Sequence, residues 1–206
     1  MKTFLLTIAT LISVSTFAQK NFETEMSKSL TEWKQTNSSA NFEKLSKDFP
    51  NEWLPKYYLV FSEVLSTFEN KNAEENYKNL DEAKTIIEAL QADNLMNPEI
   101  LNLKALYLTA EIVQNPMQKG AENTPIIQQL YAKSLMLNPS NPRSVLGLAE
   151  FNINLANYSG ADITQDCKNV KKSLALFDAD QPKKNEPKWG KDRAESLLNN
   201  QCKTIL

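Results

Sequence analysis

The segment LNPSNPRSVLGLAEF, residues 137–151, places two prolines three residues apart between two apolar stretches. Pro139 follows a completed apolar stripe, and proline ends a helix there because it lacks a backbone N–H and clashes with the preceding turn. Asn141 directly precedes Pro142; asparagine caps helix N-termini, and proline at the first helical position loses no hydrogen bond. The segment therefore predicts the end of one helix followed at once by the start of another.

The same two signals recur along the rest of the chain. Asn97-Pro98 and Thr124-Pro125 are predicted helix starts of this kind, whereas Pro50 and Pro182 follow apolar stripes and are predicted helix ends. Between these signals, apolar residues recur three and four positions apart, which is the spacing of one helical face. The last predicted helix follows Pro187 and carries Trp189. The nine predicted helices begin near Phe22, Phe42, Leu54, Ala73, Pro98, Thr124, Asn141, Ile163 and Pro187.

The composition favours an all-α fold. The chain has only four glycines, fewer than the turns of a β-sandwich or a doubly wound sheet require, and no stretch of sustained period-two alternation. Alanine, leucine, glutamate, lysine and glutamine recur instead, and these residues are good helix formers. Residues 98–113 are apolar on most sides of their predicted helix, so this helix is expected to be the most buried one.

Counting back from the predicted stop prolines reveals a repeat. The positions five and eight residues before Pro139 are Ser134 and Tyr131, and the corresponding positions before the stop prolines at 50 and 182 are apolar. Including the proline at position 98, these prolines recur at intervals of roughly 40 to 50 residues, as expected for one helical hairpin per repeat.

The segment YAKSLMLNPSNP, residues 131–142, resembles the tetratricopeptide repeat, whose second helix carries an aromatic residue, a small residue and then a proline at this spacing. The resemblance implies antiparallel helical hairpins stacked as a short tetratricopeptide-like superhelix, with about four helix pairs and a C-terminal capping helix. The pattern is degenerate, because the repeats exceed the usual length of about 34 residues and bulky Ile127 and Val170 stand where the family prefers alanine. A plain helical bundle is the alternative architecture.

The N-terminus predicts export. Residues 1–18 combine a basic residue, an apolar run broken only by threonine and serine, and small residues before the cleavage position, which is the pattern of a secretory signal peptide. The run is shorter than the ~20 residues that span a bilayer. No later segment is apolar enough to span a membrane, so we expect the mature chain, residues 19–206, to form one helical domain in the periplasm or outside the cell.

Cys167 and Cys202 are the only cysteines, and both lie in the last predicted helical hairpin. Export leads to an oxidising compartment, where disulfides persist. With the bend at residues 182–187, the two cysteines lie at about the same height on antiparallel helices, since a helix rises about 1.5 Å per residue. We therefore predict a Cys167–Cys202 disulfide; the alternative, a redox-active pair, lacks the close Cys-x-x-Cys spacing.

Several kinds of chemistry are absent from the sequence. The chain has no histidine, which excludes Ser-His-Asp and Cys-His nucleophiles and the common zinc sites. It has no glycine-rich phosphate loop, and a net charge of −2 without a basic stripe does not indicate a nucleic-acid partner. We therefore expect no catalytic residue, no metal and no cofactor, and a non-enzymatic protein.

A binding surface remains as the expected functional feature. In the tetratricopeptide family the first helices of the pairs line a groove for peptides or proteins, so the resemblance implies a protein- or peptide-binding scaffold. A subunit of an envelope complex, or a helical envelope hydrolase or carbohydrate-binding protein, are the alternatives. Each aromatic residue is expected first in the core, but neighbouring tyrosines at 57 and 58 point about 100° apart, so at most one should be fully buried. The candidate groove residues are Trp53, Tyr57, Tyr58, Asn102, Arg143 and Asn154.

Overall fold

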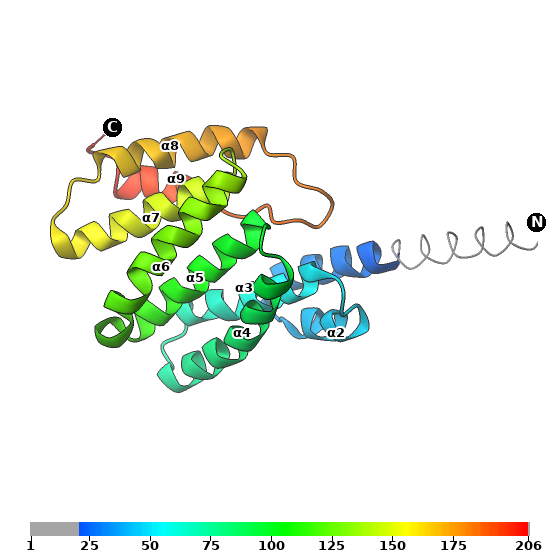
Figure 1. Ribbon diagram of the computed structural model, residues 1–206. Helices are drawn as coiled ribbons and strands as arrows, with labels where there is room; N and C mark the ends of the chain where they lie inside the picture. The colour runs from blue at the N-terminus through cyan, green and yellow to red at the C-terminus, as the bar shows by residue number, and fades with distance from the viewer. Residues whose placement is uncertain (1–20, 206) are drawn as a thin grey trace, which may run out of the picture.

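The structure is a computed structural model that describes residues 21–205. Within that range the chain consists of helices and connecting segments without a β-strand (Figure 1). The predicted signal peptide, residues 1–18, lies outside the described residues. The elements are a helix over residues 21–36, then α2 (Ala40–Asp48), α3 (Trp53–Glu69), α4 (Ala73–Asp93), α5 (Pro98–Gln114), α6 (Pro116–Leu137), α7 (Pro142–Ser159), α8 (Thr164–Ala179) and α9 (Lys191–Asn200).

Asparagine caps begin several of these helices. The side-chain oxygen of Asn97 accepts a hydrogen bond from the backbone N–H of Glu99 at 3.0 Å, and that of Asn141 accepts one from Ser144 at 3.0 Å. In both helices proline occupies the first turn, where its missing N–H has no intrahelical partner to lose. The predicted starts at Asn97-Pro98 and Asn141-Pro142 are therefore confirmed, and so is the helix end before Pro139.

The predicted start at Thr124-Pro125 is wrong. Pro125 lies inside α6, which begins at Pro116 behind an Asn115 cap, so Asn115-Pro116 is the true start signal. An interior proline normally costs about 3 kcal/mol through a lost hydrogen bond and a steric clash. Here Pro125 and Ala121, whose carbonyl loses its N–H partner, are both exposed, so water can reach that carbonyl.

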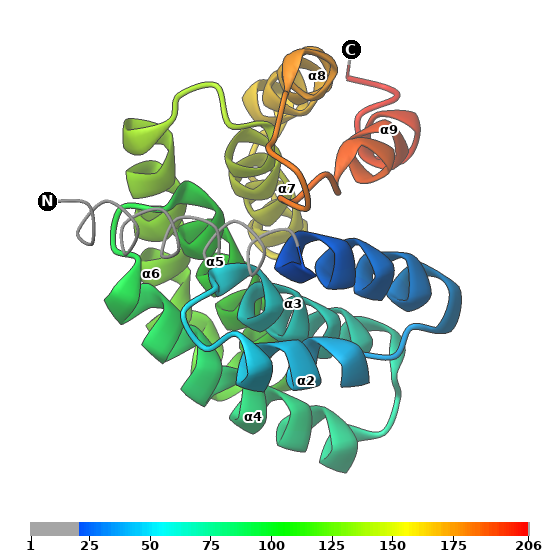
Figure 2. The ribbon, with the colours of Figure 1, turned by 90° about the vertical axis from the view of Figure 1, so that its right-hand side faces the viewer.

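The helices pair as antiparallel hairpins that stack in sequence order. α3 packs with α4, α5 with α6 and α7 with α8, and the first helices of successive hairpins also contact each other, α3 with α5 and α5 with α7. At the N-terminal end α2 packs against α3, and at the C-terminal end α9 packs against α8 (Figures 1 and 2). The all-α fold of stacked hairpins inferred from the sequence is confirmed.

The apolar interior divides into two cores. The larger core runs through helix 21–36 and α2 to α6 and also takes in Phe151 of α7. The smaller core lies among α7, α8 and α9 and contains both cysteines. α5 contributes side chains from most of its faces to the larger core, as its sequence predicts. Its buried residues are Ile100, Leu101, Asn102, Leu103, Ala105, Tyr107, Leu108 and Ala110.

Cys167 and Cys202 form the predicted disulfide, and their Cα atoms are 5.5 Å apart. Cys167 lies near the start of α8 and Cys202 shortly follows α9, so the bond closes this hairpin covalently. With a sequence separation of 35 residues, the chain-entropy model gives a stabilisation on the order of 3–4 kcal/mol.

Residues 180–190, which we call the strap, connect α8 to α9 without a helix (Figure 2). The prediction that Trp189 lies in the last helix is wrong, because α9 begins only at Lys191. The indole of Trp189 stacks on Phe61 of α3 with ring centroids 4.9 Å apart, and its Nε1 donates to the Tyr57 hydroxyl at 2.9 Å. The strap therefore carries a side chain from the C-terminal end of the chain onto the larger core.

Gly147 and Gly120 form a matched pair of helical glycines. A Cβ at Gly147 would lie 2.5 Å from the ring of Tyr131, whereas one at Gly120 would meet nothing within 4 Å. We expect Gly147→Ala to destabilise the fold by about 1–3 kcal/mol through overpacking, and Gly120→Ala to stabilise it by about 0.5–1 kcal/mol through helix propensity. Urea denaturation followed by circular dichroism measures both changes, and effects of the same sign would contradict this packing.

Candidate functional site

The candidate aromatic residues at the start of α3 lie in the core rather than in a groove. Tyr57 is fully buried and Tyr58 is 5% exposed, so the expectation that at most one of them is fully buried holds, although both belong to the larger core. Tyr58 stacks on Phe42 of α2 and also contacts Trp33 of helix 21–36. Burial raises the pKa of both tyrosines. Trp53 is half-buried with its ring edge-on to Tyr57. Helix 21–36 and α2 thus close over this side of α3.

Two polar candidates are buried where the hairpins meet. The exposed fractions of Asn102 and Arg143 are 1% and 3%, whereas Asn154 of α7 is half-buried. Asn102 accepts a hydrogen bond from the Ser144 hydroxyl at 3.0 Å, and its amide lies 3.4 Å from the side-chain oxygen of Asn141. A binding role for the six candidates stays a prediction. The expected exposure in a groove is wrong for Asn102 and Arg143, whereas the burial of Tyr57 and Tyr58 agrees with the expectation that aromatic residues lie first in the core.

Arg143 is the centre of a buried ion-pair network. Its Nε donates to Glu99 at 2.8 Å and its Nη2 donates to Asp180 of the strap at 2.9 Å. Asn141 donates to the other carboxylate oxygen of Glu99 at 2.5 Å. Burial raises the pKa of Glu99, and the charge of Arg143 partly opposes this increase. For Arg143, burial alone would lower the pKa, but the carboxylates of Glu99 and Asp180 outweigh burial and raise it. Arg143 therefore joins α5, α7 and the strap instead of facing a groove.

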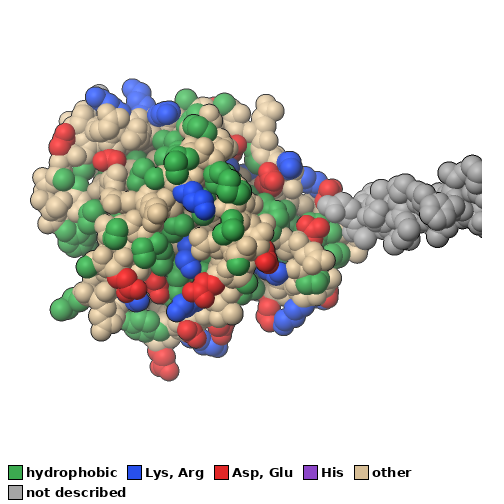
Figure 3. Space-filling model, viewed as in Figure 1, with side chains coloured by type: hydrophobic (Ala, Val, Ile, Leu, Met, Phe, Trp, Pro, Cys, Tyr) green, Lys and Arg blue, Asp and Glu red, His purple; other side chains and the backbone are tan. Residues whose placement is uncertain are grey.

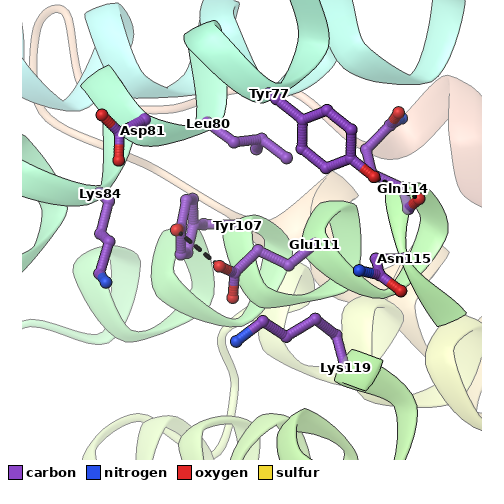
Figure 4. A pocket seen from close by; sticks show the side chains of 9 residues that line it. All are labelled: Tyr77, Leu80, Asp81, Lys84, Tyr107, Glu111, Gln114, Asn115 and Lys119. Carbon is purple, nitrogen blue, oxygen red and sulfur yellow. Dashed lines mark hydrogen bonds between the residues drawn. The ribbon is translucent and has the colours of Figure 1, made fainter. Parts of the chain in front are cut away.

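An open cleft lies between α4 and α5, beside the turn into α6 (Figure 4), and we call it the tyrosine cleft. Its cavity volume is about 200 Å³. Leu80 and Tyr107 are buried and form its floor, whereas Tyr77 is 50% exposed. The residues that line it are Tyr77, Leu80, Asp81, Lys84, Tyr107, Glu111, Gln114, Asn115 and Lys119.

Hydrogen bonds fix the two tyrosines of this cleft. The Tyr107 hydroxyl donates to Glu111 at 3.0 Å, and the Tyr77 hydroxyl donates to the backbone carbonyl of Gln114 at 3.2 Å. Burial raises the pKa of Tyr107 and the Glu111 carboxylate raises it further, so the phenol stays protonated and remains a donor. The second oxygen of Glu111 accepts from the Asn123 amide at 3.0 Å.

The charges around the tyrosine cleft are balanced. Lys84 and Lys119 are basic, and Asp81 and Glu111 are acidic. Lys84 is exposed and Lys119 is half-buried, so their ammonium groups can reach a ligand at the mouth of the cleft (Figure 4). The arrangement can therefore hold an aromatic or apolar group on its floor and a carboxylate at its edge.

A second cleft lies among α2, α3 and α4, and we call it the acidic cleft. One carboxylate oxygen of Glu63 is buried there without a hydrogen-bond partner. Burial raises the pKa of Glu63 to about 7, and the nearby carboxylates of Glu82 and Glu43 add to this shift. The lining residues are Asn37, Ser39, Glu43, Leu59, Ser62, Glu63, Ser66, Asn79, Asp81, Glu82, Thr85 and Ile86.

Residues 21–205 contain no group of three or more metal-ligating side chains placed to hold an ion. Over the same range, no helix combines the length and the apolar character needed to cross a membrane. On the face seen in Figure 3, acidic and basic side chains are interspersed, apart from a small basic group over α8.

The sequence signals did not locate the tyrosine cleft. Periodicity places Tyr77 on the apolar stripe of residues 73–93, but the structure leaves half of its side chain exposed. Asn115 lines the cleft and lies at the turn between α5 and α6. The sequence signals missed this turn because they placed the helix start at Thr124-Pro125. The dipeptide Asn115-Pro116 is the signal that reveals this turn.

No family model matches this chain, and no curated protein matches it in sequence. Among solved structures, its fold is similar to that of the HusA haemophore from Porphyromonas gingivalis, with a TM-score of 0.72. The two chains are 19% identical, and the match covers 90% of this chain and 92% of the haemophore. The similarity shows a shared all-helical architecture over nearly the full length of both chains. The likeness to tetratricopeptide repeats rests on the spacing of residues in the sequence alone.

Removal of the Arg143 side chain tests the buried network. We expect Arg143→Ala to destabilise the fold by about 3–5 kcal/mol, because it leaves the Glu99 carboxylate buried without its cation. Arg193→Ala is the matched control, since Arg193 pairs with Glu150 on the surface and its side chain is 52% exposed; its loss should cost under about 1 kcal/mol. Chemical denaturation measures both, and similar small losses would show that the network does not hold the hairpins together.

The buried carboxylate of Glu63 predicts a pH-dependent stability. Its pKa in the folded chain is about 7, above the ordinary value of 4.5, so the folded state binds the proton more tightly than the unfolded chain. Stability therefore falls as the pH rises from about 4.5 to about 7. We expect Glu63→Gln to match the wild type near pH 4 and to melt at a higher temperature near pH 8.

Thermal unfolding across this pH range measures the effect, with Glu88→Gln on the exposed side of α4 as the control. A Glu63→Gln variant whose melting temperature tracks that of the wild type at every pH would contradict the role given to burial.

Proposed function

We propose that this chain is an exported, non-enzymatic binding protein that captures haem or a related porphyrin at the tyrosine cleft. The cleft carries the proposal, because an aromatic and apolar floor lies beside two lysine side chains (Figure 4). A porphyrin has a flat apolar face and two carboxylates. Tyr77, Leu80 and Tyr107 would contact that face, and Lys84 and Lys119 would pair with the carboxylates.

The likeness to a haemophore supports haem as the first ligand to test. At about 200 Å³ the cleft is smaller than a site that encloses a drug-sized ligand, so a porphyrin would lie across it with one edge in solvent. The chain has no histidine, and both cysteines are in the disulfide. Binding therefore rests on hydrophobic contact and charge pairing rather than on histidine or thiolate ligation of iron.

Export to the periplasm or the cell exterior is part of the proposal. The signal-peptide pattern of residues 1–18 supports it, and so does the Cys167–Cys202 disulfide, which suits an oxidising compartment. The sequence register also supports a tetratricopeptide-like architecture, in which stacked hairpins present ligand surfaces and no catalytic group is required.

A protein or peptide partner is the second candidate, and exposed apolar side chains near the cleft favour it. Met117 is 95% exposed and Val113 is 55% exposed, and both flank the lining residues Gln114 and Asn115. Exposed apolar side chains at the edge of a cleft can contact a partner. A cleft of about 200 Å³ suits one apolar side chain of a partner.

Titration of the mature chain with haemin, followed by the change in haemin absorbance, tests the first candidate. We expect saturable binding of one haemin per chain. The double variant Lys84→Glu/Lys119→Glu should bind at least about tenfold more weakly, because each reversal replaces an attraction to a carboxylate with a repulsion. Lys78→Glu is the matched control, since this exposed lysine lies on α4 but does not line the cleft.

Two results would overturn the haem proposal. One is the absence of saturable haemin binding by the wild type. The other is unchanged binding by the double variant, which would place the ligand elsewhere. If a partner is captured from an envelope fraction by the wild type and not by a Met117→Glu variant, while haemin does not bind, the second candidate replaces the first.

A further inference from the structure

The strap, residues 180–190, crosses the starts of the first helices at the end of α5 opposite the tyrosine cleft. It runs from α8 past α7 toward helix 21–36 and returns to α9 (Figure 2). Its backbone has no regular structure except for a turn, in which Glu186 and Lys183 exchange hydrogen bonds of 3.1 and 2.9 Å. An extended segment lying across repeat helices has the form of a bound peptide.

Contacts at three places along its length hold the strap in place. Asp180 pairs with Arg143 of α7 at 2.9 Å. Asn185 accepts from the Ser27 hydroxyl at 2.7 Å and donates to the Glu23 carbonyl at 3.0 Å, both on helix 21–36. The third contact is the indole of Trp189 on α3. The contacts lie at the start, the middle and the end of the strap, so each part of it is recognised by a different element.

The contact at Trp189 has the features of a side-chain recognition site. The indole stacks on the ring of Phe61 with an interplanar angle of 21°. Its N–H donates a hydrogen bond to the hydroxyl of the buried Tyr57. Without an indole at this position, the Tyr57 hydroxyl loses its hydrogen-bond partner in the core. Trp189 itself is half-buried, and tryptophans packed against a partner in this way supply much of the binding energy in protein interfaces.

We propose that the starts of α3 and α7 form a peptide-binding face, and that the strap is its internal ligand. The face recognises an extended segment with a carboxylate for Arg143 and, nine residues later, an indole for Tyr57 and Phe61. A peptide of that chemistry, including the strap of a second copy, binds only where the chain's own strap has left. This proposal does not depend on the function assigned to the tyrosine cleft.

A labelled peptide of residues 180–190 tests the proposal by fluorescence anisotropy against the mature chain. The wild type should bind it weakly, because its own strap occupies the face. Trp189→Ala vacates the indole position, and we expect this variant to bind the peptide at least about tenfold more tightly than the wild type does. The same peptide with alanine in place of tryptophan should bind the variant at least about tenfold more weakly.

Two further variants separate recognition from loss of structure. Tyr57→Phe in the Trp189→Ala background keeps the ring and removes the hydroxyl, and should weaken peptide binding about two- to tenfold. Asn185→Gly keeps Trp189 and the Lys184–Glu23 ion pair but removes the two side-chain hydrogen bonds of Asn185 to helix 21–36. Glycine suits the positive φ of 66° at this position. It should bind the peptide several-fold more tightly than the wild type, even if Trp189→Ala fails to fold.

The peptide-binding measurements either support or overturn the proposed binding face. Binding that depends on the peptide's tryptophan and increases when the strap is loosened supports it. The proposal is overturned if folded Trp189→Ala and Asn185→Gly bind no more tightly than the wild type. It is also overturned if the tryptophan and alanine peptides bind equally well, because the face would then have no indole recognition.

Discussion

The buried guanidinium of Arg143 determines how the third helical hairpin sits on the second. It bonds to Glu99 at the start of α5 and to Asp180 at the start of the strap. A buried ion pair adds little net stability, but breaking one is costly, so its main effect is on geometry. Glu99 also accepts from the Asn141 amide, so two side chains at the start of α7 are tied to the start of α5. The residues that start α7 therefore also fix its position.

Local signals predicted most of the helices, because caps, prolines and apolar spacing act within a few residues. The predicted helix start near Ala73 agrees with the start of α4, where the Asn72 side chain accepts hydrogen bonds from the backbone N–H groups of Glu74 and Glu75. The sequence assigns Pro125 to a helix start because a proline inside a helix and one at its start look alike in sequence. Inside α6, the exposure of Pro125 and Ala121 lets water reach the carbonyl that loses its partner. The disulfide was predictable because two cysteines allow a single pairing.

The candidate site was harder to predict because long-range contacts decide it. Alignment with the tetratricopeptide pattern places Tyr57 and Arg143 on the first helices of their hairpins. It does not reveal that helix 21–36, α2 and the strap cover these residues. Trp189 contacts Tyr57, which lies 132 residues away in the sequence, and no local sequence pattern predicts that contact. The tyrosine cleft depends on Tyr77 and Tyr107, which come from different hairpins. Neither residue stands out until their helices are placed together.

The division of the interior into two cores sets how the molecule opens. α7 contacts α5 and α6 less extensively than it contacts α8, and the α8–α9 hairpin is closed by the disulfide. Proteins open in cooperative units that follow such differences in contact. Here α7, α8 and α9 form one unit, and the weakest seam runs between α5 and α7. Undocking along that seam would break the Arg143–Glu99 ion pair and withdraw Phe151 from the larger core, while the disulfide keeps the α8–α9 hairpin closed.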